Sequence, residues 1–174
     1  MKQTSWWVPA LVLPLLIIAA CRKTEVFRDV VVDHGDQPVG ELVAGLRIQQ
    51  TFVPNHNRLC AVALCMATYG ARAKDCRVIF SLRANGSPNV IDEKVVPCSE
   101  IVDNAWLRFD FRPLEGSKGQ TLVLSVESPN GRPGNAATIW MATEPSIYPD
   151  GVLSLNGVPT PGSLRFMTFH EQSE

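Results

Sequence analysis

The feature that most constrains the fold is a repeated alternation of apolar and polar residues in short runs, separated by turn residues. In residues 46–53, Leu46, Ile48, Gln50 and Phe52 share one face of an extended chain. Alternation with a period of two is typical of half-buried strands. Similar short runs cover residues 76–84, 90–96, 106–111, 120–128, 137–143, 152–155 and 164–169. Many short strands at this spacing predict an all-β fold, an antiparallel β-sandwich.

Residues 58–68 differ because both faces of the extended run are apolar. The side chains of Cys60, Val62, Leu64 and Met66 alternate with leucine, alanine and cysteine. Such a run predicts a central strand that is covered on both sides, although its alanines would also suit a helix. The turn residues at 69–75 and the alternating run that follows favour the strand, and they predict a hairpin between residues 58–68 and 76–84.

The N-terminal segment has the composition of an export signal. Residues 6–21 read WWVPALVLPLLIIAAC and are followed directly by the polar residues RKTE. A lysine near the start, an uncharged apolar stretch and small residues before the break are the marks of a secretory signal. The stretch is short and contains Pro9 and Pro14, whereas a spanning helix usually needs ~20 apolar residues. We therefore expect cleavage rather than membrane spanning.

The end of this segment resembles the lipobox of bacterial lipoproteins, which is an aliphatic residue, two small residues and a lipidated cysteine. Ile18, Ala19, Ala20 and Cys21 match that pattern. The resemblance implies a diacylglyceryl thioether and an N-acyl chain on Cys21, and more than one chain makes membrane anchoring stable. It also implies a place in the bacterial cell envelope, outside the cytoplasm. The alternative is an ordinary secretory signal or a signal anchor, with Cys21 only a small boundary residue.

We expect four segments along the chain. Residues 1–20 are the signal peptide, residues 21–44 a lipid-anchored tether with some strand character, residues 45–170 the β-sandwich domain and residues 171–174 a tail. The tether is expected because charged residues and turn residues surround one short β-branched run.

Four cysteines follow Cys21, and an extracytoplasmic location permits disulfides. The predicted strand argues against a bridge between Cys60 and Cys65, because five residues of extended strand span about 16 Å whereas a bridge needs Cα atoms within about 7 Å. Two complete pairings remain: Cys60 with Cys76 and Cys65 with Cys98, or Cys60 with Cys98 and Cys65 with Cys76. The alternative is that some of these four cysteines are not bridged and are buried as free thiols. No C-x-x-C motif or nearby histidine favours a zinc cluster.

Several stretches between residues 45 and 170 resemble galactose-binding-like jelly-roll modules, which are related to carbohydrate-binding modules. These are residues 103–111 (DNAWLRFDF), 117–119 (SKG), 127–129 (ESP), 156–157 (NG) and 162–166 (GSLRF). The resemblance implies a jelly-roll and a sugar site in which a pyranose stacks on an aromatic ring beside polar side chains. Ser163 departs from the pattern, where an Asp is expected.

The candidate ligand-binding residues follow from strand alternation and turn position. If Leu107, Phe109 and Phe111 face the core, then Trp106, Arg108 and Asp110 share the opposite face. Tyr69 and Tyr148 lie in expected turns, where ligand contacts concentrate. The alternative for each aromatic ring is a packing role.

Composition and motifs argue against several other functions. The formal net charge of −1 and the absence of a basic run exclude the usual footprint of nucleic-acid binding. Neither G-x-S-x-G nor H-E-x-x-H occurs, and His34, His56 and His170 are expected to be isolated and solvated. We therefore expect no enzyme and no cofactor. Two alternatives use the carboxylates Asp103, Asp110, Glu115 and Glu127: a structural calcium ion, or a catalytic pair for glycoside hydrolysis.

The expected function is non-catalytic binding of carbohydrate or another envelope polymer. The alternative is a structural or assembly subunit that docks to a membrane complex for polysaccharide synthesis or export. A sugar site should be a groove with converging polar groups, while a docking site should be a flatter apolar patch. An exposed aromatic ring would also favour the sugar site.

Overall fold

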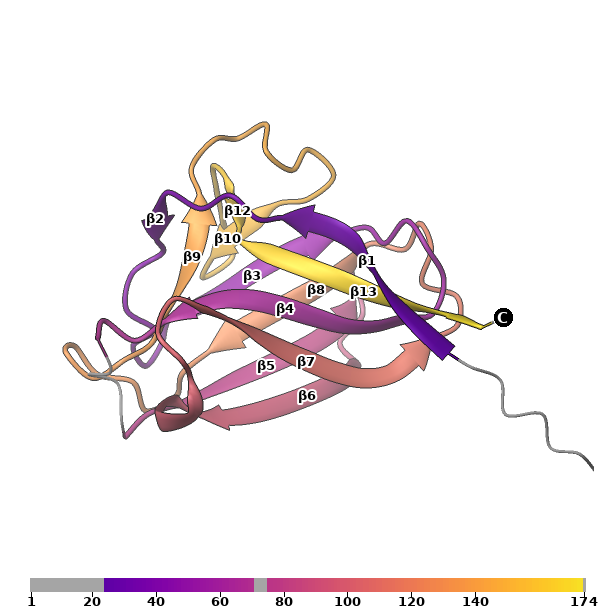
Figure 1. The fold of residues 1–174 in the computed structure, drawn as a ribbon. Helices are drawn as coiled ribbons and strands as arrows, with labels where there is room; N and C mark the ends of the chain where they lie inside the picture. The colour runs from indigo at the N-terminus through magenta and orange to yellow at the C-terminus, as the bar shows by residue number, and fades with distance from the viewer. Residues whose placement is uncertain (1–23, 71–74, 174) are drawn as a thin grey trace, which may run out of the picture.

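The computed structural model describes residues 24–70 and 75–173. The signal peptide and Cys21 lie outside the described residues. The described chain is almost entirely β-structure, arranged as two antiparallel sheets (Figure 1). Its one helical element is the 3-10 turn η1 (Cys98–Glu100), and it contains no α-helix. The all-β prediction is therefore confirmed at the level of two packed antiparallel sheets.

The first sheet has seven strands in the order β1-β13-β4-β9-β12, with β2 paired to β9 and β7 paired to β4. Its strands are β1 (Thr24–Val32), β2 (Gln37–Pro38), β4 (Leu59–Ala67), β7 (Ala105–Leu114), β9 (Thr138–Ala142), β12 (Ser163–Leu164) and β13 (Phe166–Ser173).

The second sheet has six strands in the order β11-β10-β3-β8-β5-β6. Its strands are β3 (Arg47–Phe52), β5 (Arg77–Ala84), β6 (Val90–Pro97), β8 (Leu122–Glu127), β10 (Leu153–Leu155) and β11 (Val158–Thr160). In β3 the burial alternates as the sequence predicts, with Ile48, Gln50 and Phe52 buried.

The core lies between the inner faces of the two sheets. The ring of Phe52 on β3 lies 5.9 Å from that of Phe166 on β13, and the rings of Phe80 on β5 and Phe109 on β7 are 3.7 Å apart. Each pair joins one sheet to the other, so the two apolar faces exclude water together. Burial of these faces is the main force that holds the fold.

Strand β4 is buried along its whole length, which confirms the prediction for this segment. Large side chains face the core, while the outer face carries a row of small residues, Ala61, Ala63, Cys65 and Ala67. Side chains of neighbouring strands cover this row: the Arg108 guanidinium lies 4.2 Å from the Phe169 ring centroid. Small residues are required here because the long neighbours occupy the space above them.

The predicted hairpin between residues 58–68 and 76–84 is wrong. β4 and β5 belong to different sheets, and β5 pairs with β6 and β8. The chain crosses from one layer to the other between these strands. Alternation shows which face of a strand is apolar, but two strands facing one core from opposite sides have the same pattern as two paired strands.

Most of the expected tether is also part of the fold, and that expectation is wrong for residues 24–44. β1 pairs with β13, and its side chains Val30 and Val32 are 6% and 3% exposed in the core. Leu42 is fully buried. At the other end β13 extends to Ser173, so the expected tail belongs to the sheet over its first three residues.

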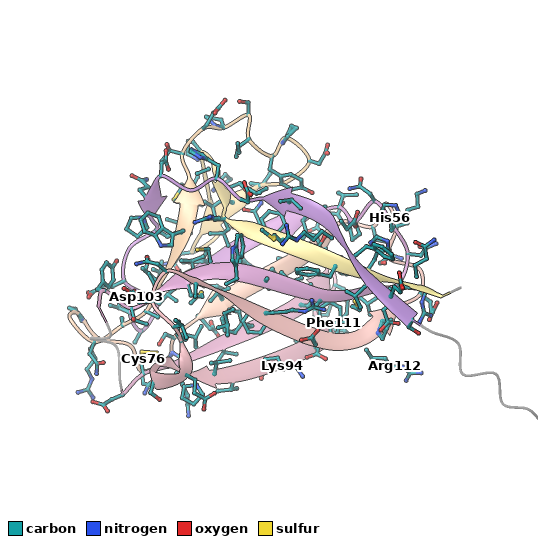
Figure 2. All side chains as sticks on the ribbon, in the orientation of Figure 1. His56, Cys76, Lys94, Asp103, Phe111 and Arg112 are labelled. Carbon is teal, nitrogen blue, oxygen red and sulfur yellow. A yellow bond between two sulfur atoms is a disulfide. The ribbon has the colours of Figure 1, made fainter. Side chains whose placement is uncertain are left out.

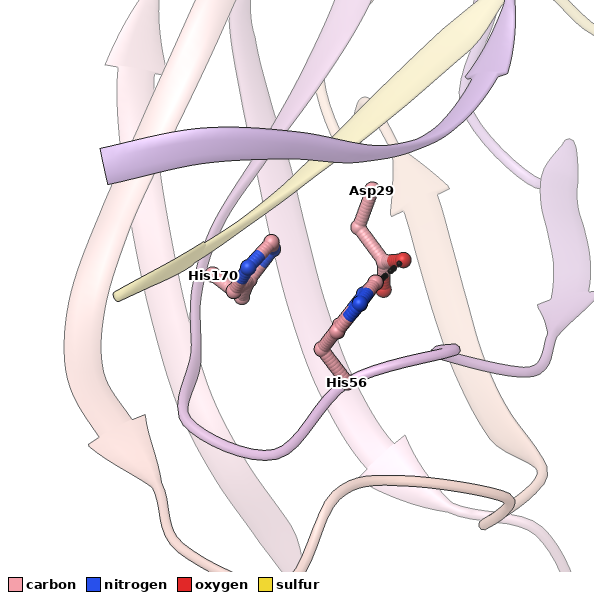
Figure 3. Close-up of side chains that lie close together, drawn as sticks. All are labelled: Asp29, His56 and His170. Carbon is pink, nitrogen blue, oxygen red and sulfur yellow. Dashed lines mark hydrogen bonds and ion pairs between the residues drawn. The ribbon is translucent and has the colours of Figure 1, made fainter. Parts of the chain in front are cut away.

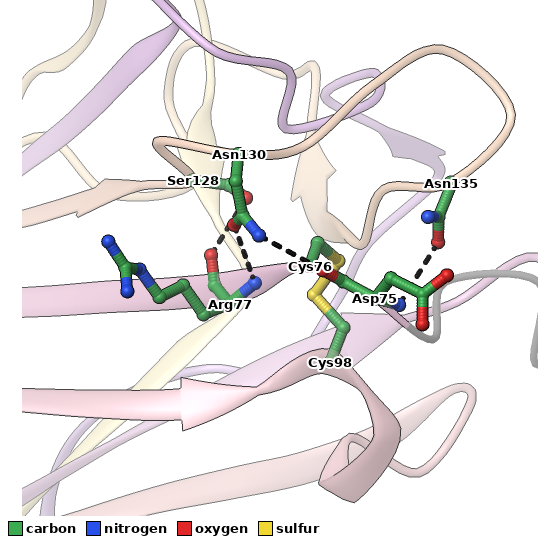
Figure 4. The surroundings of a disulfide bond; sticks show 7 residues. All are labelled: Asp75, Cys76, Arg77, Cys98, Ser128, Asn130 and Asn135. Atoms are coloured by element: carbon green, nitrogen blue, oxygen red, sulfur yellow. Dashed lines mark hydrogen bonds between the residues drawn. A yellow bond between two sulfur atoms is a disulfide. The ribbon is translucent and has the colours of Figure 1, made fainter.

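The disulfide joins Cys76 to Cys98, so neither of the two complete pairings forms. Antiparallel pairing of β5 and β6 places Arg77 opposite Pro97. Cys76 precedes Arg77 and Cys98 follows Pro97, so the Cα atoms of the two cysteines lie 5.2 Å apart. Figure 4 shows that Asn130 also fastens this end of β5, since its side chain bonds to Asp75 and Arg77. Cys60 and Cys65 are buried free thiols, as the alternative held.

Candidate functional site

Trp106, Arg108 and Asp110 lie exposed on the outer face of β7, as the alternation predicts. Each of them already contacts another side chain. The Arg108 Nε donates a hydrogen bond to the Asp110 Oδ1 at 2.9 Å, and the Arg165 guanidinium lies 5.2 Å from the Trp106 ring centroid. Trp106 remains 36% exposed. The structure thus brings the three expected residues together on one face, in a network that also covers β4.

The two candidate tyrosines are separated by the fold. Tyr148 is 9% exposed, its hydroxyl accepts a hydrogen bond from the Val53 N–H at 3.0 Å, and its ring meets Phe166 edge-on. Burial raises the pKa of this hydroxyl. Tyr148 is therefore a core residue, and its assignment to a ligand site is wrong. Tyr69 is exposed in the turn after β4.

Asp103 fastens the turn that contains Tyr69. Its carboxylate accepts hydrogen bonds from the backbone N–H groups of Thr68 at 2.5 Å and Gly70 at 3.2 Å. These bonds, the one from Thr68 first, lower the pKa of Asp103. Asp103 and His56 lie at opposite ends of β4 (Figure 2). The carboxylates considered for calcium have different partners: Asp110 binds Arg108, Glu115 binds Arg58 and Glu127 binds Arg47.

A groove with both polar and apolar lining lies over the outer face of the six-stranded sheet. Its larger part has a volume of about 650 Å³ and a smaller part has about 190 Å³. Both parts are lined by Arg47 of β3 and Glu127 of β8, so they adjoin. The other polar side chains that line them are Gln49, Ser81, Arg83, Glu93, Ser125, Ser128 and Asn156.

Cross-strand pairs hold the polar side chains of the groove in place. Arg47 is opposite Glu127 in the β3–β8 pair, and its Nε lies 3.0 Å from the Glu127 Oε2. Gln49 is opposite Ser125, and its Nε2 donates to the Ser125 Oγ at 3.0 Å. The Asn156 Oδ1 accepts the Arg47 backbone N–H at 2.7 Å. These contacts therefore hold the polar side chains of the groove in fixed positions.

Alternation along β3 and β5 places Arg47, Gln49, Ser81 and Arg83 on the faces opposite the buried side chains, but alternation alone does not bring the two strands together. The missing information was the strand order, because β3, β8 and β5 are neighbours only in the folded sheet. The sequence pattern that could have indicated the groove is the row of polar side chains on the outward face of each of these three strands, β3, β8 and β5. Pairing of β3 with β8 and of β8 with β5 converts those three faces into one surface.

A second cluster lies at the end of the seven-stranded sheet, where Asp29, His56 and His170 meet (Figure 3). The two imidazole rings are stacked, with centroids 4.2 Å apart. Burial lowers the pKa of His170, and the neighbouring His56 lowers it further. The expectation that His56 and His170 are isolated is wrong, and His170 is buried, whereas the His56 side chain is 56% exposed as expected. Nothing in the sequence spacing could have joined them, since 114 positions separate the two residues.

Comparison with known proteins adds no family assignment. No family model matches the chain, and no curated protein matches it significantly. Among the described residues there is no helix long and apolar enough to cross a membrane. The structure therefore defines a two-sheet β-domain with a groove over one sheet, and the function must be inferred from its surfaces.

Proposed function

We propose that this chain is a lipid-anchored, extracytoplasmic protein of the bacterial envelope whose jelly-roll domain binds carbohydrate or a similar envelope polymer without catalysing a reaction. The lipobox at residues 18–21 supports the anchor. The groove over β3, β8 and β5 supports the binding role. The resemblance of residues 103–111 and 162–166 to sugar-binding jelly-rolls supports the ligand class.

The observation that carries this proposal is the chemistry of the groove walls. Sugar hydroxyls donate and accept hydrogen bonds at many points, so they are bound by side chains of both kinds. Arg47 supplies donors, Glu127 supplies acceptors, and Gln49 and Asn156 supply both. The Arg47–Glu127 ion pair is made by the Nε of the guanidinium, so the terminal N–H groups are not used by this pair and can donate to a ligand.

The groove is a better candidate than the face of β7 for a physical reason. The polar side chains of both faces already contact neighbouring side chains, so these contacts do not distinguish the two sites, and the shape of the surface does. The groove offers a volume of about 650 Å³, which lies within the usual range for small-ligand sites. We therefore place the ligand over the six-stranded sheet and keep the β7 face as the competing site.

The docking role is the second candidate, and exposed apolar side chains on the edge strands favour it. On β1, Val26, Phe27 and Val31 are between 42% and 46% exposed, and on β6 Val90 and Val95 are more than half exposed. Edge strands with apolar surface are suited to pairing with another chain. In this role a partner from a polysaccharide synthesis or export complex covers these strands.

A glycan array with three variants separates these proposals. The protein used is the fragment of residues 22–174, which contains both sheets. We expect it to bind one class of glycan, and we expect Arg47→Ala to weaken binding by about 10-fold to 100-fold, because a hydrogen bond to a charged group contributes about 1.5–3 kcal/mol. Glu127→Gln keeps the shape of the groove and tests its charge. Trp106→Ala should leave binding unchanged.

The outcomes distinguish the candidates. Binding that is lost in Trp106→Ala and kept in Arg47→Ala would move the site to the face of β7. Binding to no glycan at all would contradict the carbohydrate role and favour docking. In that case Val31→Asp and Val95→Asp should abolish the recovery of a membrane partner by crosslinking.

A further inference from the structure

The cluster of Asp29, His56 and His170 combines three side chains from parts of the chain that are distant in sequence. Asp29 is on β1, His56 lies in the loop between β3 and β4, and His170 is on β13. One possible ligand atom from each residue can be chosen so that all lie within 4.8 Å of one another (Figure 3). No other such group of three occurs among the residues that the structure describes.

Two irregularities in the sheet direct these side chains to one point. The register of β1 against β13 shifts between Arg28 and Val31, where Asp29 lies. The register of β13 against β4 shifts between Phe169 and His170. Bulges of this kind bend a strand and re-aim its side chains, and they are frequent beside functional sites. Two of the three residues of the cluster thus sit at interruptions of otherwise regular pairing.

The burial of the cluster is unusual for these residue types. The Asp29 side chain is 1% exposed, and His170 is 8% exposed. The Asp29 oxygens accept hydrogen bonds from the Asn55 N–H and pair with the His56 Nδ1, both at 2.9 Å. The His170 Nδ1, by contrast, is buried without a hydrogen-bond partner. Buried polar nitrogens without a partner are rare in folded proteins, and this one belongs to a ring that can ligate a metal ion.

The donor set indicates which ligand fits. Two imidazole nitrogens and one carboxylate suit zinc and neighbouring divalent transition metals, whereas calcium and magnesium prefer oxygen ligands alone. A cavity of about 350 Å³ lined by His56, His170 and Arg58 adjoins the cluster and gives access to solvent. The charge of Arg58 is balanced by ion pairs to Glu115 and Glu171, so it opposes a bound cation less.

We propose that Asp29, His56 and His170 bind one divalent transition-metal ion of the zinc class, with a water molecule from the adjoining cavity as the fourth ligand. The lone pairs of an imidazole lie in the ring plane, so two stacked rings do not point at a common ion. One ring must turn, and it is His56, whose side chain is 56% exposed and lies in a loop. Binding therefore replaces the ring stack and the His56–Asp29 hydrogen bond with bonds to the metal.

The test is a titration of the full chain, purified with a chelator and kept in detergent, with Zn²⁺ and separately with Ca²⁺. Calorimetry should give one Zn²⁺ per chain and no calcium binding at the site. His56→Ala should weaken zinc binding by about 100-fold or more, since loss of even a supporting partner costs 10-fold to 100-fold. The matched control is His34→Ala, because His34 is exposed in the loop after β1 and outside the cluster.

A spectroscopic measurement keeps the proposal testable if a buried variant fails to fold. Co²⁺ in place of Zn²⁺ should show the intense visible absorption of a four-coordinate site, and Asp29→Asn and His170→Gln should remove it. His56→Ala changes a loop residue, and circular dichroism should show that it remains folded. Zinc binding that is equal in the unmodified chain and in His56→Ala, or a six-coordinate cobalt spectrum, would overturn the proposal.

Discussion

At the scale of single residues, Gln50 is the buried polar group that joins the two sheets. It lies on β3 and is fully buried. Its Oε1 accepts the Leu164 N–H at 3.0 Å and faces the Ser163 Oγ at 3.3 Å, both on β12 of the other sheet. Its Nε2 donates to the Thr51 carbonyl at 3.0 Å. Ser163, where the jelly-roll pattern expects an Asp, is thus a buried partner of this amide.

We expect Gln50→Leu to destabilise the protein although it adds apolar surface to the core. The Leu164 N–H would lose its acceptor in a dry environment, and an unsatisfied buried group costs about 1–3 kcal/mol. Urea unfolding measures the effect. The matched control is Gln49→Leu on the outer face, which should change the free energy of unfolding by no more than about 0.5 kcal/mol. Equal effects of both variants would contradict the role of Gln50.

Asp103 should make stability depend on pH. Hydrogen bonds from Thr68 and Gly70 lower the pKa of this carboxyl in the folded state, so the unfolded chain binds the proton more readily. Its contribution is present above the unfolded pKa of about 3.9 and is lost as pH falls through the lower folded pKa. Urea midpoints measured from about pH 5 downward should fall less steeply in Asp103→Asn than in the unmodified chain. Asp33→Asn, in the exposed loop after β1, should keep the original slope.

At the scale of elements, β1 shows how a segment with little sequence signal becomes part of a sheet. Val30 and Val32 face the core, while Val31 between them is 45% exposed. Three β-branched residues in a row have no alternation of their own. The alternation is imposed by pairing with β13, which turns neighbouring side chains to opposite faces.

This segment gives a prediction with a control in the next residue. Val32→Ala should lower the free energy of unfolding by about 1.5–3 kcal/mol, because two buried methyl groups are lost at about 0.8 kcal/mol each and a cavity is left behind. Val31→Ala, an identical change at an exposed position, should have a small effect. Thermal or urea unfolding of the two variants tests whether β1 is packed against the core. Two small, equal effects would mean that residues 24–32 behave as a tether.

At the scale of the whole molecule, one apolar core is shared by both sheets, and one disulfide ties two parts of the same sheet. The ring pairs Phe52–Phe166 and Phe80–Phe109 each cross from one sheet to the other. Within residues 24–70 and 75–173 neither sheet has a second apolar layer to pack on, so neither is expected to remain folded without the other. The Cys76–Cys98 bridge spans 22 positions and acts on the unfolded chain as well as on the folded one.

Reduction of this bridge should lower the free energy of unfolding by about 3 kcal/mol, because the unfolded chain gains the entropy of an open loop. Unfolding should remain one transition in both redox states, with tryptophan fluorescence and far-ultraviolet circular dichroism giving the same midpoint. Trp106 and Trp140 report on the seven-stranded sheet, while circular dichroism reports on both. The double variant Cys76→Ala/Cys98→Ala should not respond to reductant. Two separate midpoints would contradict a shared core.

Some parts of the fold could be predicted because they depend on neighbours in sequence. The strand β4 is apolar on both faces, and the alternation of β3 and β7 assigns Phe52 and Phe109 to the core. The exposed row of Trp106, Arg108 and Asp110 follows from the same alternation. Tyr148 could not be placed in this way, because a turn residue has no periodic neighbours and its burial depends on Phe166 and Val53.

The sequence by itself determined the all-β class, most strand positions and the inward face of each regular strand, because side-chain alternation is a local property of extended backbone. Only the tertiary structure decided which strands pair, and therefore the Cys76–Cys98 bridge, the groove at Arg47 and Glu127, and the meeting of His56 with His170. Pairing depends on contacts between residues far apart in the chain, and strands with the same apolar pattern are interchangeable until packing in three dimensions selects their partners.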